Sequence, residues 1–164
     1  MTNVARRSYK EHAIETVATG LRKAMTQENA ERMTWVPMPP SKVLGHPDHD
    51  DRLTRIMAKA FNDYDADIRP LLRQTSSTEA DHNAASRLTP DALYALTEVD
   101  RSVLNACPVR QVIVLFDDVL TTRKHFKCCE RRLRETVATD VPIIGVFIAR
   151  RILPDTAAEF DVLT

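Results

Sequence analysis

Two adjacent carboxylates, Asp117 and Asp118, directly follow the five apolar residues Val112–Phe116. An apolar run of this length, bounded by polar residues, predicts a strand that is buried on both faces of a parallel sheet. The two carboxylates then stand at the carboxyl end of that strand, where open α/β sheets bind their ligands. Because carboxylate oxygens accept hydrogen bonds from hydroxyl groups, the pair is suited to binding a sugar.

Two threonines, Thr121 and Thr122, follow at the predicted start of the next helix. A helix start offers free backbone N–H groups and the positive end of the helix dipole, so it is a natural place for a phosphate. At least one of these threonines is expected to be the N-cap, which is compatible with phosphate binding. The carboxylates and the amides together predict a phosphorylated ribose as the ligand.

The stretch Gln111–His125 resembles the phosphoribosyl-diphosphate (PRPP) motif of the type I phosphoribosyltransferases. In that family an apolar run is followed by two acidic residues, two apolar residues, hydroxyl or small residues, a glycine, a small residue and a closing Thr or Ser. The residues that fit are Val112, Ile113, Val114, Leu115, Asp117, Asp118, Val119, Leu120, Thr121 and Thr122. Three residues depart from the pattern, because Arg123 replaces the glycine, Lys124 the small residue and His125 the closing hydroxyl.

The resemblance implies transfer of a phosphoribosyl group from PRPP to a nitrogen acceptor, with release of pyrophosphate. Asp117 and Asp118 would bind the ribose hydroxyls and stabilise the positive charge that develops at the anomeric carbon. Mg²⁺ would be held chiefly by PRPP itself, so no protein metal cage is expected. The 5′-phosphate would lie against residues that follow the acidic pair: Val119, Leu120, Thr121, Thr122, Arg123, Lys124 and His125. The alternative is that Arg123, Lys124 and Lys127 form a solvated basic face of the helix.

Two further loops have counterparts in the family by their order along the chain. Ser41 and Lys42 lie where the pyrophosphate loop is expected, after a predicted first core strand. Arg73 and Arg87 flank a polar stretch where the flexible catalytic loop is expected. The fragment Val36-Pro37-Met38-Pro39 is similar to that of the competence-protein-like branch of the family.

Apolar periodicity predicts an α/β fold: a central, mostly parallel sheet with helices on both faces. The resemblance implies the type I phosphoribosyltransferase fold with a small irregular hood. Helices are expected over Ser8–Met25, from a cap at Asp50 or Asp51 through Phe61, from Pro90 through Leu96, and over Thr122–Thr136. Strands are expected at Thr34–Met38, Ile68–Leu72, Gln111–Phe116 and Val141–Ala149, with a mobile loop over Arg73–Arg87.

The 164 residues predict a single domain over 1–164, and 23 basic residues balance 23 acidic ones. With no net charge, a nucleic-acid partner is not expected. No apolar stretch approaches the roughly 20 residues that cross a bilayer, so no membrane association is expected. Three cysteines without zinc-like spacing predict a reduced, cytoplasmic protein. The resemblance also implies a homodimer.

Two other functions compete with the transferase. The same fold can serve as a non-catalytic module that senses PRPP or a nucleotide, or that binds another protein. The second alternative is a metal-dependent hydrolase built around His46 and His49, although their spacing matches no common metal motif and a polar loop that caps a helix also explains it.

Overall fold

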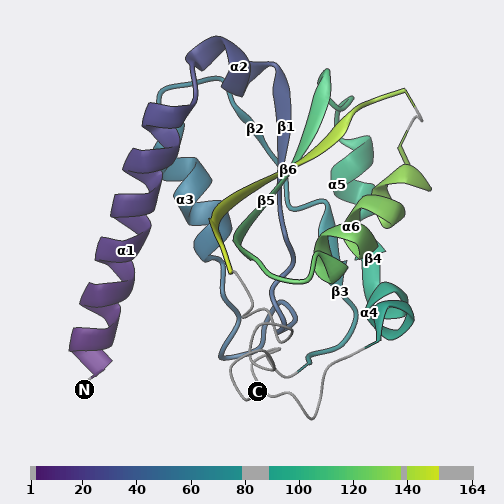
Figure 1. Ribbon diagram of the computed structural model, residues 1–164, viewed down its shortest axis with the longest axis horizontal. Helices are drawn as coiled ribbons and strands as arrows, with labels where there is room; N and C mark the ends of the chain where they lie inside the picture. Colours follow the sequence, from purple (N-terminus) through teal and green to yellow (C-terminus); the bar gives the residue numbers. More distant parts are fainter. Residues whose placement is uncertain (1–2, 79–88, 138–139, 152–164) are drawn as a thin grey trace, which may run out of the picture.

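The computed structural model describes residues 3–78, 89–137 and 140–151. At its centre lies a four-stranded sheet in the order β2-β1-β5-β6, in which every neighbouring pair is parallel (Figure 1). The strands are β1 (Met33–Pro37), β2 (Asp67–Ile68), β5 (Val112–Leu120) and β6 (Ile143–Arg150). The predicted central parallel strand at 112–116 is therefore confirmed.

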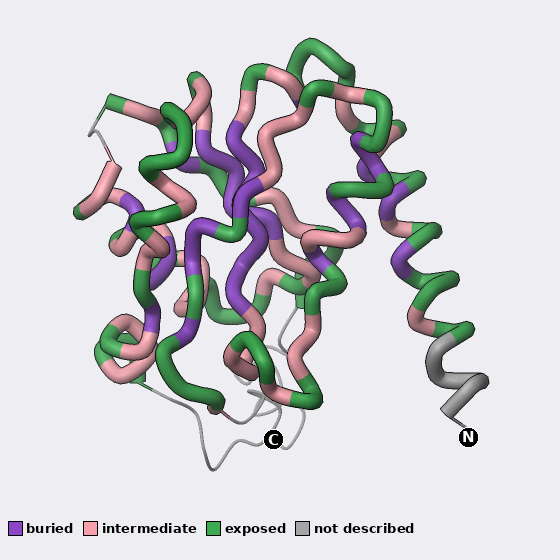
Figure 2. The backbone as a smooth tube through the Cα atoms, turned by 180° about the vertical axis from the view of Figure 1, so that it is seen from behind, coloured by how far each residue is buried: buried purple, intermediate pink, exposed green. Residues whose placement is uncertain are grey.

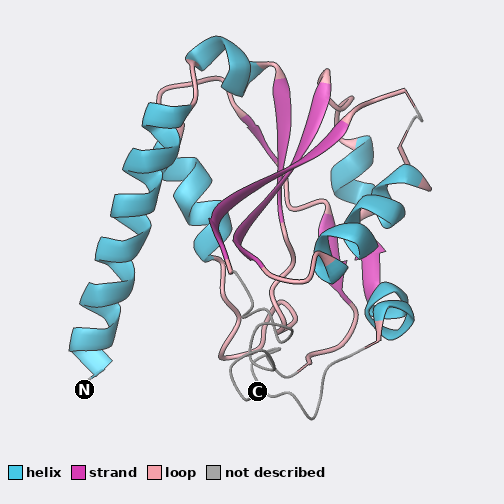
Figure 3. Ribbon diagram, in the orientation of Figure 1, coloured by secondary structure: helices cyan, strands magenta, loops and turns pink. Residues whose placement is uncertain are grey.

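Helices lie on both sides of this sheet (Figure 3). On one side are α1 (Asn3–Ala24) and α3 (Arg52–Ala60), and α2 (Gln27–Glu31) joins α1 to β1. On the other are α4 (Pro90–Leu96), α5 (Arg101–Asn105) and α6 (Lys124–Arg134), with a small antiparallel pair of β3 (Leu72–Gln74) and β4 (Thr97–Val99). The predicted α/β class is confirmed.

The core forms where the apolar faces of these elements meet, and Figure 2 shows the buried residues concentrated along the strands. Trp35 of β1 is fully buried, with its ring 4.9 Å from that of Phe61 and 6.5 Å from that of Phe116. Its indole N–H donates to the Ala30 carbonyl at 3.0 Å, which satisfies the polar end of the side chain. The predicted apolar stripe of α3 is buried as expected: Leu53, Ile56, Met57, Ala60 and the following Phe61.

The predicted strand Ile68–Leu72 is wrong as a single strand. The chain instead forms β2, which ends at Ile68, and β3, which begins at Leu72 and belongs to the other sheet. Pro70 lies between them, and because proline has no N–H to donate to a ladder, it separates the two. The expected polar loop also begins later, since Arg73 lies in β3. Arg87 lies outside the described residues.

The motif strand is longer than predicted. Its pairing with β1 ends at Pro37 opposite Phe116, whereas its pairing with β6 continues to Leu120 opposite Arg150. The acidic pair therefore lies within β5, just beyond the end of β1, and not after the strand. The apolar run ends at Phe116 because the strand beyond it is less buried. The backbone there still pairs with β6.

All three cysteines are free thiols; Cys107 is exposed, and Cys128 and Cys129 are buried. Burial raises the pKa of the Cys129 thiol well above its usual value, which keeps it in the unreactive protonated form. We expect a thiol reagent to modify Cys107 alone in the native protein and all three thiols in denaturant. Mass spectrometry of the alkylated protein would check this, and rapid native labelling of Cys129 would contradict the packing of α6.

Across the described parts of the chain, none of the helices combines the length and apolar character needed to cross a membrane.

Candidate functional site

The order of the strands places a crevice beside the acidic pair. After β1 the chain forms β2 on one side of it and then returns to form β5 on the other side. Such a reversal leaves a crevice outside the carboxyl ends of the two central strands, where open α/β sheets bind ligands. Here the two ends are joined by a hydrogen bond from the Met38 N–H to the Phe116 carbonyl, 2.9 Å long.

Asp117 and Asp118 face opposite sides of the sheet, because successive side chains of a strand alternate. Asp118 faces α3, where its carboxylate forms an ion pair with the Arg52 guanidinium at 2.7 Å. Arg52 also lies 3.5 Å from the carboxylate of Asp50, so it bridges two acidic groups at the start of α3. Asp117 is on the side of α6, where its charge contributes to raising the pKa of Cys129.

Burial, together with the charge of Asp118 and a side-chain hydrogen bond between the two carboxyl groups, raises the pKa of Asp117 to about 7. A hydrogen bond from the Asp118 N–H to Asp117 Oδ1, 2.9 Å long, and the charge of Arg52 act in the opposite direction. The Val119 N–H likewise donates to Asp118 Oδ1 at 2.7 Å. Each carboxylate thus accepts a hydrogen bond from the amide of the next residue.

The turn after β5 differs from the predicted helix start. The expected N-cap role of Thr121 or Thr122 is wrong, because Arg123 is the N-cap and α6 begins at Lys124. Arg123 has φ 63° and ψ 0°, a left-handed conformation that a β-carbon disfavours. This is the position that glycine holds in the PRPP motif. Both threonines are exposed, and His125 is half-buried in the first turn of α6.

Replacing Arg123 with glycine should therefore stabilise the protein. Relief of the left-handed strain, about 1–2 kcal/mol, outweighs the larger entropy that glycine gives the unfolded chain, about 0.5–1 kcal/mol. We expect urea denaturation to show a free energy of unfolding higher by roughly 0.5–1 kcal/mol for Arg123→Gly. Lys127→Gly is the control, because Lys127 is an exposed residue inside α6. Its free energy of unfolding should be lower than that of the parent by about 1 kcal/mol. The same sign for both variants would contradict this reading of the turn.

A basic pocket of about 310 Å³ opens between the starts of α4 and α6. Its lining carries four cationic side chains and a threonine hydroxyl: Arg123, Lys124, Lys127, Arg131 and Thr122. Asp91 is the acidic residue in the same lining, and Tyr94 supplies a ring that lies under the Arg131 guanidinium at 4.2 Å. The excess of positive charge suits an anion.

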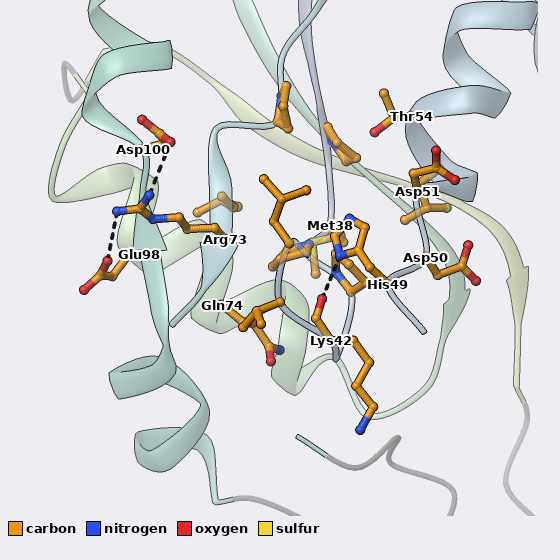
Figure 4. A pocket seen from close by; sticks show the side chains of 18 of the residues that line it. Met38, Lys42, His49, Asp50, Asp51, Thr54, Arg73, Gln74, Glu98 and Asp100 are labelled. Carbon is orange, nitrogen blue, oxygen red and sulfur yellow. Dashed lines mark hydrogen bonds and ion pairs between the residues drawn. The ribbon is translucent and has the colours of Figure 1, made fainter. Parts of the chain in front are cut away.

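A larger pocket of about 710 Å³ lies between the loop after β1 and the β3–β4 pair (Figure 4). It contains Lys42, for which no ion pair is present within the described residues, and Arg73, which lies 3.6 Å from both Glu98 and Asp100. Ser41 does not line it; its carbonyl instead accepts a hydrogen bond from the Thr78 N–H at 2.8 Å. The loop after β1 is thereby tied to the end of the β3 segment.

No protein-family model matches the chain, and no curated protein matches it. The function of the site must therefore be inferred from its geometry.

The histidines at 46 and 49 are held by the backbone of their own loop. Nδ1 of His46 accepts from the Asp48 N–H at 3.1 Å, and Nδ1 of His49 lies 2.8 Å from the Lys42 carbonyl. Within the described residues, no three His, Cys, Asp or Glu side chains come together to hold a metal ion.

Sequence reasoning brought the acidic pair and the following turn together but missed Arg52. Nothing in the local pattern around Asp50, Asp51 and Arg52 distinguishes a helix cap from an arginine that reaches across to β5. The pairing depends on how α3 packs against the sheet, which no local signal encodes.

Proposed function

We propose that the protein binds phosphoribosyl diphosphate with Mg²⁺ in the crevice between β1 and β5 and transfers the phosphoribosyl group to a nitrogen acceptor. In this proposal the chain has the type I phosphoribosyltransferase fold, including its irregular hood. The observation that carries it is the coincidence of the acidic pair with the reversal of strand order. The motif and the sheet topology independently predict ligand binding at the carboxyl end of β5.

The ribose would lie against Asp117 and Asp118. Asp118 would exchange the Arg52 guanidinium for a ribose hydroxyl, which leaves Arg52 beside the diphosphate, where its charge is favourable. Asp117 would stabilise positive charge at the anomeric carbon from the other side. This requires the charged form of Asp117, so its pKa of about 7 predicts that affinity for PRPP rises as the pH increases through 7.

The 5′-phosphate would lie in the basic pocket, and the diphosphate would lie along the loop after β1, at the Lys42 edge of the larger pocket. The basic pocket, with Thr122, Arg123 and Lys124 in its lining, supports binding of the 5′-phosphate at the start of α6. Lys42 and the amides around Ser41 would bind the diphosphate. Mg²⁺ would arrive with the diphosphate oxygens, because Mg²⁺ favours a few carboxylates and substrate phosphates over an all-protein cage. A cytoplasmic homodimer remains part of the proposal.

Isothermal titration calorimetry with PRPP and Mg²⁺ tests the proposal. We expect binding by the parent protein and an affinity about 100-fold lower for the variant with both Asp117→Asn and Asp118→Asn, since two charged hydrogen bonds are lost. Asp140→Asn is the control, because this exposed residue precedes β6 at the opposite end of the sheet. Absence of heat in the parent would exclude PRPP as the ligand.

A pyrophosphate-release assay with a panel of heterocyclic bases separates the enzyme from the sensing module. The strained Arg123 and the occupied Asp118 are the two features that favour the sensor, because both lie where the transferase motif needs glycine and a free carboxylate. Turnover with any base supports the transferase. Binding of PRPP without turnover supports the module.

A further inference from the structure

His49 lies in the wall of the 710 Å³ pocket, where its ring contacts the backbone of Lys42 (Figure 4). Its Nδ1 is 2.8 Å from the carbonyl oxygen of Lys42. A carbonyl only accepts hydrogen bonds, so Nδ1 must be the donor and must carry a proton. The neutral imidazole then has its lone pair on Nε2.

Nε2 of His49 has no hydrogen-bond partner within the described residues, and it is not among their buried unsatisfied atoms. The residue is half-buried and lines the pocket, so this nitrogen keeps access to solvent beside the cavity. A lone pair of fixed direction at the wall of a cavity is an acceptor that is ready for a ligand N–H. The backbone contact sets both the tautomer and the orientation of the ring.

The rest of the pocket favours a flat, largely apolar ligand next to this nitrogen. Met38, Leu53, Leu72 and Val103 provide apolar walls. The charged side chains in the lining are Lys42, Asp50, Asp51, Arg73, Glu98 and Asp100. Most are already neutralised: Arg73 lies between Glu98 and Asp100, and Asp50 forms an ion pair with Lys10 at 2.9 Å.

The pocket also adjoins the crevice proposed for PRPP. Met38, in the lining, donates to the Phe116 carbonyl immediately before Asp117. Asp50, also in the lining, is linked through Arg52 to Asp118. A ligand in this pocket would therefore lie next to the anomeric carbon of a ribose held by the acidic pair.

We propose that Nε2 of His49 accepts the N–H of a nitrogen heterocycle bound in this pocket and takes up its proton during phosphoribosyl transfer, an inference that rests on the proposed function. The heterocycle nitrogen forms a bond to the anomeric carbon while the bond to the diphosphate oxygen breaks, and that electron pair leaves with pyrophosphate. The proton of the heterocycle moves to Nε2, and the resulting imidazolium releases it to solvent.

The test uses the full chain, labelled with ¹⁵N, and titrates it with imidazole, uracil and hypoxanthine, with and without PRPP and Mg²⁺. Long-range ¹H–¹⁵N spectra of the histidine rings report each nitrogen separately. We expect the free protein to show a proton on Nδ1 of His49, and at least one probe to shift the Nε2 signal. His49→Asn keeps an amide donor near the Nδ1 position but removes Nε2. We expect this variant to bind that probe with an affinity lower by about tenfold or more. His46→Asn, in the same loop but outside the pocket lining, is the matched control.

The outcomes for His49 and for PRPP are separable. If no probe moves the Nε2 signal, or if His49→Asn binds the probe as tightly as the parent, the inference is overturned even where calorimetry detects PRPP. A response at Nε2 without PRPP heat supports the heterocycle site and overturns the proposed function instead. Where the parent turns over, His49→Asn should lower kcat by about 100-fold or more, with little change in PRPP affinity.

Discussion

Asp117→Asn should stabilise the protein by on the order of 2–4 kcal/mol at pH 8 and leave its stability at pH 4 nearly unchanged. The cause is burial, which raises the pKa of Asp117 from 3.8 to about 7. Between these two values the folded state holds a proton that the unfolded state releases, so stability falls as the pH rises through this window. Above pH 7 the full cost of a buried charge is present, about 1.4 kcal/mol for each pKa unit. Asparagine removes that charge.

Urea denaturation of the parent and the variant at several pH values between 4 and 8 would measure this difference. The same substitution should weaken the proposed binding of PRPP, so a gain in stability would accompany a loss of that binding. Asp140→Asn, an exposed residue, should show little dependence on pH. A stability difference for Asp117→Asn that is equal at pH 4 and pH 8 would show that the carboxyl is not the titrating group.

Asp67→Ala should lower the free energy of unfolding by about 3–5 kcal/mol, because it leaves a buried guanidinium without its counter-charge. Asp67 and Arg69 form an ion pair at 2.6 Å, and their side chains are only 11% and 8% exposed. The hydroxyl of Thr34 donates to the same carboxylate at 2.6 Å and accepts from the Arg110 N–H at 2.8 Å. Arg69 also donates to the carbonyls of Cys107 and Pro108. This network joins the starts of β1 and β2 to the segment before β5.

Asp65→Ala is the matched control, because its carboxylate is 89% exposed and its ion pair with Arg110, at 3.2 Å, should contribute less than about 1 kcal/mol. Replacing both members of the buried pair, as Asp67→Val with Arg69→Met, should recover most of the loss. Nε of Arg69 has no partner among the described residues, which makes the pair easier to replace. PRPP affinity should be unchanged in all of these variants, since the network lies at the amino-terminal end of the sheet. A loss below 1 kcal/mol for Asp67→Ala would mean that water reaches Arg69.

The strands and long helices could be predicted wherever one residue's environment follows from its neighbours in sequence. The α3 stripe is an example, since Leu53, Ile56 and Met57 share a face and are all buried. The helix start at Pro90 is another, with the Thr89 hydroxyl accepting from the Ala92 N–H at 3.2 Å. Both features depend on contacts within a few residues.

The short elements were missed for two reasons: one depends on a distant partner strand, and the others are too short to show periodicity. β4 forms by pairing with β3, about 25 residues earlier in the chain. α2 and α5 have only five residues each, too few for periodicity to be recognised, although caps at Thr26 and Asp100 mark both.

The geometry around the predicted site residues differs from what the sequence led us to expect. The acidic pair was expected beyond the strand, yet β6 extends the pairing of β5, and strand alternation directs Asp118 toward α3 and Asp117 toward α6 while the two carboxyl groups still interact. The threonine caps were expected from residue type alone, and the left-handed Arg123 moved the helix start past them. In both cases the backbone conformation, set by pairing and by the turn, decides where a side chain points.

The hydrogen bonds from the Asp118 and Val119 amides to the preceding carboxylates have one more consequence. A sugar whose hydroxyls donate to those carboxylate oxygens would displace the two amide N–H groups. These N–H groups could then donate to an anionic group of the same ligand. Sugar recognition and phosphate recognition would then be thermodynamically coupled. Ribose alone would form only the hydrogen bonds to the carboxylates, and inorganic phosphate alone only those to the amides. The binding free energy of ribose 5-phosphate should therefore be more favourable than the sum of the values for the two fragments.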